Sequence, residues 1–426
     1  MIAATLVLII FIVTLIVIIS EKVNETATVL FGMCLAGVVL YFANTLTFPE
    51  MLQLIQWDAI IFVTAMMIVV SVAGSSGMFR YIALLMVRGT KGDPRQVFLA
   101  FMNLVFVLSF IFDPLPTMLV MGSFTIEVCQ ALDIDFRPIL ISEVIVANFA
   151  SIPSVVGSVP NLVIVVLAGI DVGLMFIALL PLAIIMHVVT VWYLLRYYKK
   201  KLVAGEGSDV NLLMMIKPDT MIKSRHDFYL SIFALAILVL GFALGPSVRL
   251  EASLIAMLVA SGMLIFSHER AKELLRRLSW DTVFFLIGLF GLIVALEQTG
   301  LTALLVDGFS GAIGDNPFLA ILALIWIPGL VLSIIDNIPV AALLSPIAES
   351  FAGGNPAVPL SLIIGANVGG YIIPFGDAPN MIAVNLAAEK GKPISFREFT
   401  RIAFPLGLLH LVMGTIYMFA LVFILA

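Results

Sequence analysis

Long apolar runs recur along the whole chain and are separated by short polar loops. They include residues 2–19, 59–74, 228–246 and 402–426, none of which contains Lys, Arg, Asp or Glu. A run of about 20 apolar residues can cross roughly 30 Å of hydrocarbon as an α-helix. The pattern therefore predicts an all-α, polytopic membrane protein.

The spacing of these runs predicts five membrane spans in each half of the chain. The predicted spans of the first half are residues 2–20, 26–46, 58–77, 137–171 and 173–195. Those of the second half are residues 227–245, 251–267, 281–299, 357–388 and 402–425. Glycine and proline interrupt 137–171 and 357–388, so we expect both to be broken helices.

Two further apolar segments turn back on themselves at a proline motif. Residues 97–132 turn at DPLP and residues 317–352 turn at DNIP, so each is expected to enter and leave the membrane on one side as a re-entrant hairpin. The segments just before them, 78–92 and 300–314, combine apolar residues with glycine and a few charges. They are predicted to be interfacial connecting helices.

The two halves also repeat each other in detail. Asp113 and Asp336 each open a D-x-x-P motif, and each follows its own Trp-Asp pair, at 57–58 and 280–281, by the same separation. The first break is matched position for position by the second: Asn148, Gly157, Pro160 and Asn161 correspond to Asn367, Gly376, Pro379 and Asn380. Three separate motifs that recur in register indicate a duplication.

The positive charges predict how the two repeats are oriented. Lys and Arg gather on one side of the predicted spans, with Arg249 alone on the other, and cytoplasmic loops carry the excess of these residues. The loop before Trp57 has neither residue, whereas the loop before Trp280 has four. We therefore expect inverted repeats at 1–196 and 227–426, a cytoplasmic linker at 197–226, and both termini outside the plasma (inner) membrane.

Composition excludes other broad classes. The chain is 62 % hydrophobic and only 12 % charged, against about 25 % charged residues in soluble domains. A soluble enzyme or a nucleic-acid binder is excluded, and the general partner is the lipid bilayer. Residues 2–20 lack the basic region and cleavage site of a signal peptide, which favours a first membrane helix. Cys34 and Cys129 stand in apolar runs and predict neither a disulfide nor a zinc site.

The candidate site lies where the helices are irregular. Inside a bilayer, irregular backbone is tolerated only where it is buried in protein or lines a watery cavity. Inverted repeats would bring the two hairpin tips and two breaks together near the midplane, as a small polar site. The candidate substrate- or ion-binding residues are Asp113, Thr117, Asn148, Ser158, Asn161, Asp336, Asn337, Asn367, Gly376, Asp377 and Asn380.

Acidic residues set the expected chemistry. Asp113, Asp336 and Asp377 each suit a helix N-cap, but intramembrane acids are costly, which favours a functional role. They are expected to couple transport to Na⁺ or H⁺, with Asp336, Asn337 and Asp377 as candidate Na⁺ ligands; no other cofactor is expected. Glu143 is a candidate proton relay, and a satisfied structural group is an equal alternative. Structural roles are expected for Glu127, Glu349, His187 and His410, and a capping role for Asp58 and Asp281.

At these residues the chain resembles the ion transporter superfamily. The match is to its arsenite-permease, sodium/proton-antiporter and citrate-transporter-like branch, which includes the melanosomal P protein. The motifs that carry it are DNIP (336–339), LISEVIVAN (140–148), GSVPN (157–161), GDAPN (376–380) and GKPISFREF (391–399). The resemblance implies a homodimer with scaffold and transport domains that works by an elevator-type movement. The acid common in the first break is Ser158 here, so the polar centre leans toward the second half.

These observations favour a secondary transporter and no enzymatic activity. No Lys or Arg falls at the two hairpin tips or in the two breaks, so a cation or a neutral hydroxide such as arsenous acid suits the site better than an anion. Na⁺/H⁺ exchange and arsenite extrusion lead, and citrate or dicarboxylate symport with a cation is the alternative. An intramembrane aspartyl protease is a remote alternative, since Pro374-Phe-Gly-Asp377 lacks the first glycine of the Gly-x-Gly-Asp motif.

Overall fold

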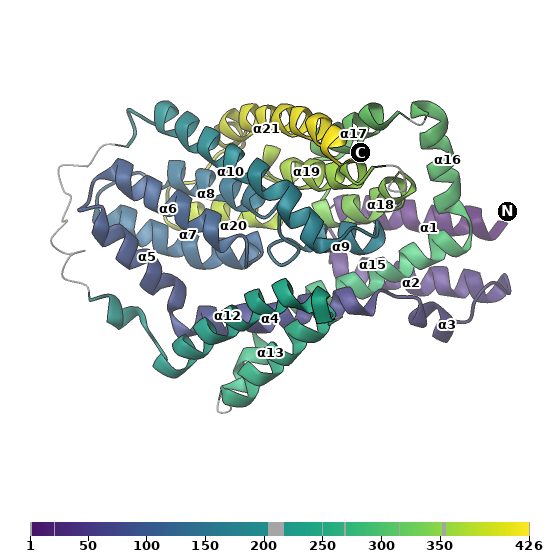
Figure 1. Ribbon diagram of the computed structural model, residues 1–426, viewed down its shortest axis with the longest axis horizontal. Coiled ribbons are helices and arrows are strands. Elements are labelled where there is room, and N and C mark those ends of the chain that lie inside the picture. The colour runs from purple at the N-terminus through teal and green to yellow at the C-terminus, as the bar shows by residue number, and fades with distance from the viewer. Residues whose placement is uncertain are drawn as a thin grey trace.

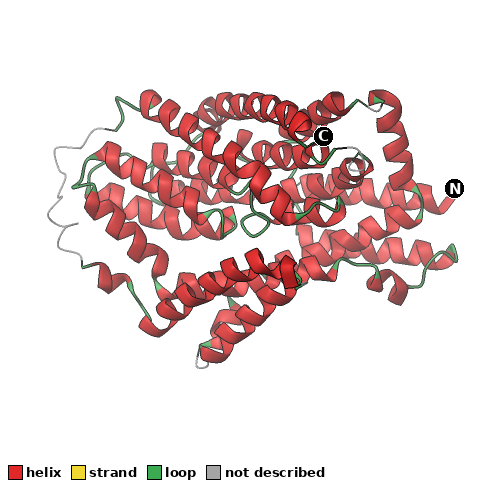
Figure 2. Cartoon of the chain, viewed as in Figure 1, coloured by secondary structure: helices red, strands yellow, loops and turns green. Residues whose placement is uncertain are grey.

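The computed structural model describes residues 2–20, 22–202, 217–248, 250–267, 270–314, 316–351 and 355–425. Over these residues the chain forms helices joined by loops and turns, and it contains no strand (Figure 2). Arg249, predicted to lie alone on the outer side, and residues 203–216 of the predicted linker are outside the described residues.

The first half consists of ten helices within the described residues. They are α1 (Ile2–Ile19), α2 (Glu25–Phe42), α3 (Phe48–Gln53), α4 (Trp57–Ser76), α5 (Met78–Gly89), α6 (Pro94–Leu108), α7 (Pro114–Ala131), α8 (Arg137–Ala150), α9 (Val159–Leu167) and α10 (Val172–Tyr197). A short 3₁₀-helix, η1 (Pro218–Met221), precedes the second half.

The second half repeats this series of lengths and breaks. It consists of α12 (Arg225–Val248), α13 (Ala252–Phe266), α14 (Ala271–Arg276), α15 (Trp280–Gln298), α16 (Leu301–Ile313), α17 (Pro317–Trp326), the π-helical turn η2 (Ile327–Val331), α18 (Asn337–Ser350), α19 (Ala357–Ile372), α20 (Ala378–Glu389) and α21 (Phe396–Ile424).

Six helices of the described residues are long and apolar enough to cross a membrane. They are α2, α4, α10, residues 225–242 of α12, α15 and α21. Helices α1, α6, α13 and α19 are also apolar but shorter. The predicted all-helical fold with several apolar spans is thereby confirmed.

The irregular elements of the two halves pack crosswise. Helices α1, α2, α3, α15 and α16 lie toward one end of the long axis, and α5, α6, α7, α8 and α10 toward the other (Figure 1). Between them α18, the return arm of the second hairpin, packs on α9, which follows the first break. In the same way α7, the return arm of the first hairpin, packs on α20. Each hairpin therefore contacts the broken helix of the other half.

Two tryptophans show how far the duplication extends into local geometry. The indole N–H of Trp57 donates to the carbonyl of Leu52 at 2.9 Å, and that of Trp280 donates to the carbonyl of Leu275 at 3.0 Å. Donor and acceptor of the second bond correspond to those of the first in the repeat register set by the hairpin acids. The short helices α3 and α14, which precede these tryptophans, recur in the same register. They were not predicted, because so few residues carry no clear pattern.

The predicted capping role of Asp58 and Asp281 is wrong. The N-cap positions of α4 and α15 are Gln56 and Ser279, and neither makes a side-chain capping bond. The two aspartates lie in the first turn instead, where a negative charge interacts favourably with the helix dipole.

Glycine allows the second broken helix to pack directly on the second hairpin. A Cβ atom at Gly365 of α19 would lie 2.6 Å from the carbonyl oxygens of Leu324 and Ile325. A Cβ at Gly369 would lie 2.5 Å from the carbonyl oxygen of Pro328, inside η2. Small residues permit such close backbone contact between membrane helices, and here they bring α19 against the backbone of α17 and η2.

We therefore expect Gly365→Ala to destabilise the protein. The added methyl group meets backbone atoms that cannot rotate away, and overpacking of this kind costs about 1–3 kcal/mol. Thermal denaturation in detergent would measure the change. Gly262→Ala is the matched control, because Gly262 lies in α13 and a Cβ there would meet nothing within 4 Å. Equal melting temperatures for the two variants would contradict this account of the packing.

Candidate functional site

The two hairpin aspartates cap the helices that follow them. Asp113 is the N-cap of α7, and its Oδ1 accepts a hydrogen bond from Leu115 N–H at 3.0 Å. Asp336 is the N-cap of α18 and accepts equally from Ile338 N–H at 3.0 Å. The other carboxylate oxygen of Asp113 accepts from Val159 N–H at 3.4 Å, in the first turn of α9. The first hairpin tip is thus joined to the first break.

In each break, one asparagine side chain donates hydrogen bonds to backbone carbonyls. The side-chain amide of Asn161 donates to the carbonyls of Ser151 (2.9 Å), Ile152 (3.2 Å) and Ser154 (3.0 Å). These carbonyls lie just beyond the end of α8, and only that of Ser151 also accepts a backbone hydrogen bond among the described residues, from Ser154 N–H at 2.9 Å. A buried carbonyl without a partner is costly, so the amide stabilises the irregular backbone.

Asn380 does the same in the second break. Its amide donates to the carbonyls of Gly370 (2.7 Å) and Ile373 (3.0 Å). Gly370 and Ile373 are the counterparts of Ser151 and Ser154 in the register that pairs Asn380 with Asn161. The same side chain therefore stabilises the same backbone positions in both halves.

Asn367 connects the two breaks to each other. Its Oδ1 accepts hydrogen bonds from the hydroxyls of Ser151 and Ser158, both at 3.2 Å. Its amide donates to Asn161 Oδ1 at 2.5 Å and to the carbonyl of Ile363 at 2.8 Å. Ser158 also accepts from Asn161 N–H at 3.5 Å as the N-cap of α9. An asparagine of the second half is thereby fully bonded inside the first break.

Polar side chains from α8, α18 and the N-cap of α20 converge at Gly370, near the end of α19. A Cβ at Gly370 would lie 3.1 Å from Asn337 Nδ2, 3.4 Å from Asn148 Oδ1 and 3.4 Å from Asp377 Oδ2. Asn337 itself donates to Asp377 Oδ2 at 3.2 Å. The absence of a side chain at Gly370 leaves this space to the polar atoms around it.

Asp377 differs from the other two acids. It occupies the N-cap position of α20 but makes no side-chain capping bond. The capping role weighed for it is thus not what the geometry shows. The preceding Gly376 has no room for a side chain, since a Cβ there would lie 2.7 Å from the carbonyl of Gly370 and 2.9 Å from that of Ser333. This close fit directs Asp377 toward Asn337.

The second break also leaves an oxygen without a partner. Asn380 Oδ1 is buried and accepts no hydrogen bond from any described residue. The counterpart atom, Asn161 Oδ1, accepts from Asn367. The counterpart of that donor is Asn148, whose amide instead donates to the carbonyl of Val144 at 3.1 Å. Of these two equivalent amide oxygens, the unpartnered one therefore lies in the second break, where Asp377 also lies.

The three acids share one negative environment. Asp113, Asp336 and Asp377 lie within electrostatic reach of one another. Over the described ranges, no Lys, Arg or His pairs with any of them. Each acid is half-buried, while the surrounding asparagines (Asn148, Asn161, Asn337, Asn367 and Asn380) are buried. The arrangement is a group of half-buried acids beside buried amides.

The next question is whether metal-ligating side chains cluster in the described chain. The described chain contains no group of three or more His, Cys, Asp or Glu that could hold a metal ion. A cation bound at the centre would therefore need amide or backbone oxygens in addition to the carboxylates. Asn337, Asn148 and Asn380 are the residues that the geometry offers for this.

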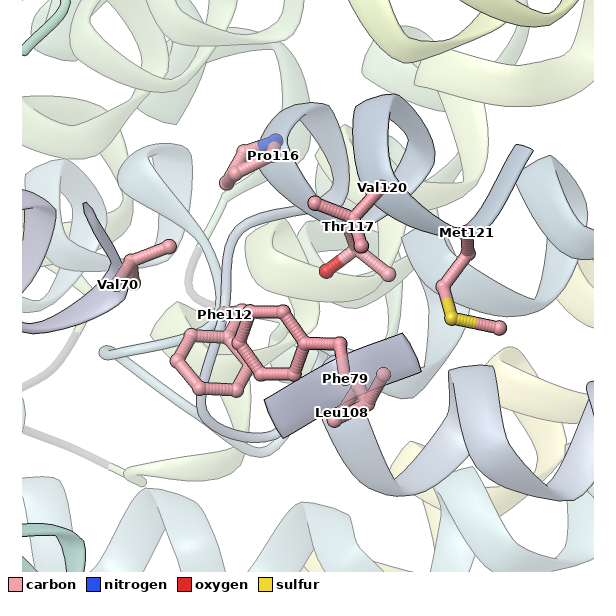
Figure 3. A pocket seen from close by; sticks show the side chains of 8 residues that line it. All are labelled: Val70, Phe79, Leu108, Phe112, Pro116, Thr117, Val120 and Met121. Atoms are coloured by element: carbon pink, nitrogen blue, oxygen red, sulfur yellow. The ribbon is translucent and has the colours of Figure 1, made fainter. Parts of the chain in front are cut away.

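Thr117 lies away from the polar centre. It lines an apolar pocket with Val70, Phe79, Leu108, Phe112, Pro116, Val120 and Met121 (Figure 3). Its hydroxyl is buried, has no hydrogen-bond partner within the described residues, and points toward the rings of Phe79 and Phe112. The structure does not bring Thr117 together with the three acids.

This pocket has a counterpart in the second half. The second pocket is lined by Ile293, Thr302 and Leu343, the counterparts of Val70, Phe79 and Val120 in the repeat register, among others. Both pockets lie where the long third span and the connecting helix meet the hairpin's return arm. The duplication therefore extends to the packing around the hairpins.

Glu143 also lies outside the centre. It is fully buried in α8, before Asn148. One carboxyl oxygen accepts a hydrogen bond from Thr125 at 2.6 Å, and the other has no partner among the described residues.

Outside the membrane, Asp135 stands just before α8. Partial burial raises the pKa of the Asp135 carboxyl, but the hydrogen bonds and charge of Arg137 and the charge of Lys392 together lower it more, so the pKa lies below its ordinary value.

Sequence reasoning missed several residues of the site and its support. Ser151, Ser154 and Gly370 join the network through positions that the repeat alignment pairs, so comparing the two breaks residue by residue is the signal that finds them. Tyr371 was missed as well; its hydroxyl bonds His410, which also bonds Thr190 at 2.8 Å.

The predicted structural role of the two histidines agrees with these contacts. His187 bonds Asn103 at 3.0 Å. His187 and His410 occupy corresponding positions in the repeat register of the hairpin acids.

Comparison with known proteins places the chain among transporters. A family model described as citrate transporter matches residues 15–361. A 46 kDa membrane protein of Mycobacterium leprae is 28 % identical over 415 residues, covering 96 % of both chains. An uncharacterized transporter of Mycobacterium tuberculosis is 27 % identical and covers 98 % of both chains. The P protein of Mus musculus is 26 % identical over 94 % of this chain but only 58 % of its own length.

Solved structures show the same fold at low sequence identity. The MtrF protein of Neisseria gonorrhoeae, described as one of a class of antimetabolite efflux pumps, aligns with a TM-score of 0.63 at 11 % identity, over 100 % of this chain and 96 % of that one. The YdaH transporter of Alcanivorax borkumensis aligns with a TM-score of 0.58 at 14 % identity, over 84 % of each chain. With the family model matching most of the sequence, the chain belongs to the citrate transporter family of integral, multi-pass membrane proteins.

Proposed function

We propose that this protein is a secondary active transporter that couples H⁺ or Na⁺ to the movement of a small ion or solute. The observation that carries the proposal is the meeting of Asp113, Asp336 and Asp377 at two hairpin tips and one break, without a basic partner in the described chain. Acids placed inside a membrane protein mark ion pathways and proton relays by default. Na⁺/H⁺ exchange and arsenite extrusion are the leading reactions.

The contacts around the second break support a cation as the species bound. Asp377, Asn148 Oδ1 and the unpartnered Asn380 Oδ1 offer oxygen atoms in a small region around Gly370. Hard cations prefer carboxylate, amide and backbone oxygens. An anion alone would meet three carboxyl groups and no Lys or Arg. This charge balance supports cation transport over free anion transport.

The crosswise packing supports an elevator mechanism with alternating access. Because α18 packs on α9 and α7 on α20, both hairpins and both broken helices can move together as one transport domain. Inverted repeats, a cytoplasmic linker at 197–226, outside termini and a homodimer belong to the same proposal.

Citrate or dicarboxylate symport is the second candidate, and the family description favours it. In this reaction the cation bound by the acids would compensate the carboxylates of the substrate. Relatives named as transporters favour transport over the remote alternative of an intramembrane aspartyl protease.

An uptake panel in proteoliposomes tests the function. Purified protein would be offered Na⁺, arsenite, citrate and succinate, each with and without an imposed pH or Na⁺ gradient. We expect at least one of them to accumulate only when a gradient is present. Uptake that equilibrates equally fast without any gradient would indicate a channel and contradict secondary transport.

Asp336→Asn should abolish gradient-driven flux while the protein still folds. Asparagine is as good an N-cap as aspartate, so the bond to Ile338 N–H is retained while the charge is lost. An interaction with a charged group contributes about 1.5–3 kcal/mol, so flux should fall at least about tenfold. Glu127→Gln is the control, because Glu127 is an exposed acid of the other hairpin. Unchanged flux in the Asp336 variant would remove this residue from the coupling site.

Asp377→Ser should also fold and lose gradient-driven flux. Serine is the residue that the first break carries at this position, where Ser158 supports the same half-helix geometry. The variant therefore removes the acid that distinguishes the second break and keeps a side chain known to suit the backbone. Measuring both flux and melting temperature separates a loss of coupling from a loss of stability. A variant with full flux would show that Asp377 is dispensable.

A further inference from the structure

Glu143 occupies a position between the charged end of α8 and the polar centre. It follows Arg137, which pairs with Asp135 at 2.8 Å and Glu398 at 3.5 Å. From the helical rise per residue, Glu143 is about 9 Å from Arg137 and about 7.5 Å from Asn148 along the helix. The group is thus too far from Asn148 to belong to the centre, and it is fully buried.

The surroundings of this carboxyl contain no counter-charge. Its only hydrogen bond in the described chain is the one from Thr125 to Oε1, and Oε2 is free. The thiol of Cys129, one turn further along α7, is buried nearby. Three titratable groups of other helices packed on α8 bond elsewhere: His187 to Asn103, Tyr371 to His410, and Glu398 to Arg137 and Lys201. On α6 and α20, Arg95 and Glu389 are exposed.

An unpaired buried charge costs several kcal/mol, whereas a proton on Oε2 makes the carboxyl neutral and leaves the Thr125 bond intact. The free oxygen and the missing counter-charge are therefore what a group that holds a proton needs. Thr125 fixes the orientation of the carboxyl, because its hydroxyl donates to the oxygen that does not receive the proton.

The second half shows that the fold does not require this pair. The register that pairs Asn161 with Asn380 makes Leu362 the counterpart of Glu143. The register of the hairpin acids makes Ala348 the counterpart of Thr125. Both are fully buried, and α18 packs on α19 there as α7 packs on α8. Two apolar residues therefore fill the same place in the same architecture. An acid and a hydroxyl in one half alone indicate a role other than packing.

We propose that Glu143 is a proton-binding site separate from the three aspartates, with Thr125 as its positioning residue. In each cycle Oε2 takes up one proton from water on one side and returns it to water on the other. This inference rests on the proposed transport function and names Glu143 as the residue that carries the transported proton. Asp113, Asp336 and Asp377 then bind the second cation or the substrate.

Infrared difference spectroscopy of the purified full-length protein tests the site without any transport. Titration should reveal the carbonyl band of a protonated carboxylic acid that is missing in Glu143→Gln and shifted in Thr125→Ala. Glu349→Gln, which alters the acid on the second hairpin's return arm, should keep the band. A spectrum in which Glu143→Gln removes no such band would overturn the proposal.

Proteoliposomes test the role of the site in coupling. Vesicles with an internal pH dye would be given a Na⁺ or a citrate gradient, and equilibrium exchange of labelled Na⁺ or citrate would be followed in parallel. We expect Glu143→Gln to retain exchange but to reduce proton movement per transported ion at least about tenfold. Proton movement equal to that of the unaltered protein would refute the assignment.

The double variant Glu143→Leu, Thr125→Ala reproduces the pair found in the second half. It should fold with an unchanged or higher melting temperature and lose the same proton movement. A strong loss of stability would instead assign the pair to packing and overturn the proposal. If the unaltered protein moves none of the tested solutes, the transport function fails, while the infrared titration still decides whether Glu143 binds a proton.

Discussion

The structure depends on two asparagine amides that satisfy broken backbone inside a membrane. Without water, each carbonyl freed by a helix break needs a partner, and Asn161 and Asn380 supply it at equivalent positions. Because the amides stabilise the breaks, glycine and proline can separate α8 from α9 and α19 from α20 without unfolding the segment. The polar centre exists because these breaks are tolerated, and each hairpin then packs on the broken helix of the other half.

The two halves share this architecture but divide the chemistry between them. In the first break, the side chains of Ser151, Ser158 and Asn161 are hydrogen-bonded to Asn367 of the second half. The second break leaves Asn380 Oδ1 unpartnered within the described chain and adds Asp377 beside Asn337. Glu143 provides the reverse asymmetry, an acid of the first half whose counterpart is Leu362. The two copies of the repeated architecture thus carry different acids.

Much of the fold could be predicted from the sequence, because each signal is local. Apolar runs have the length that a membrane helix needs, and Gly157, Pro160, Gly376 and Pro379 mark the breaks. The motif spacings also indicated the duplication and the crowding of acids in the second half. Short elements such as α3 and α14 were not predictable, since so short a segment carries no periodicity. The roles of Asp58 and Asp281 were misjudged because a cap is decided by backbone angles at the start of the helix, ahead of the acid.

The sequence by itself determined where helices cross and break, and which positions carry acids, since these follow from hydrophobicity and from backbone restrictions on glycine and proline. Only the tertiary structure decided which polar groups meet. Thr117, one turn after Asp113, faces an apolar pocket, while Gly370, which has no side chain, lies at the convergence of Asn148, Asn337 and Asp377. The physical reason is that a hydrogen bond depends on the direction of a side chain and on the approach of a distant helix. Neither quantity is contained in the spacing of residues along one chain.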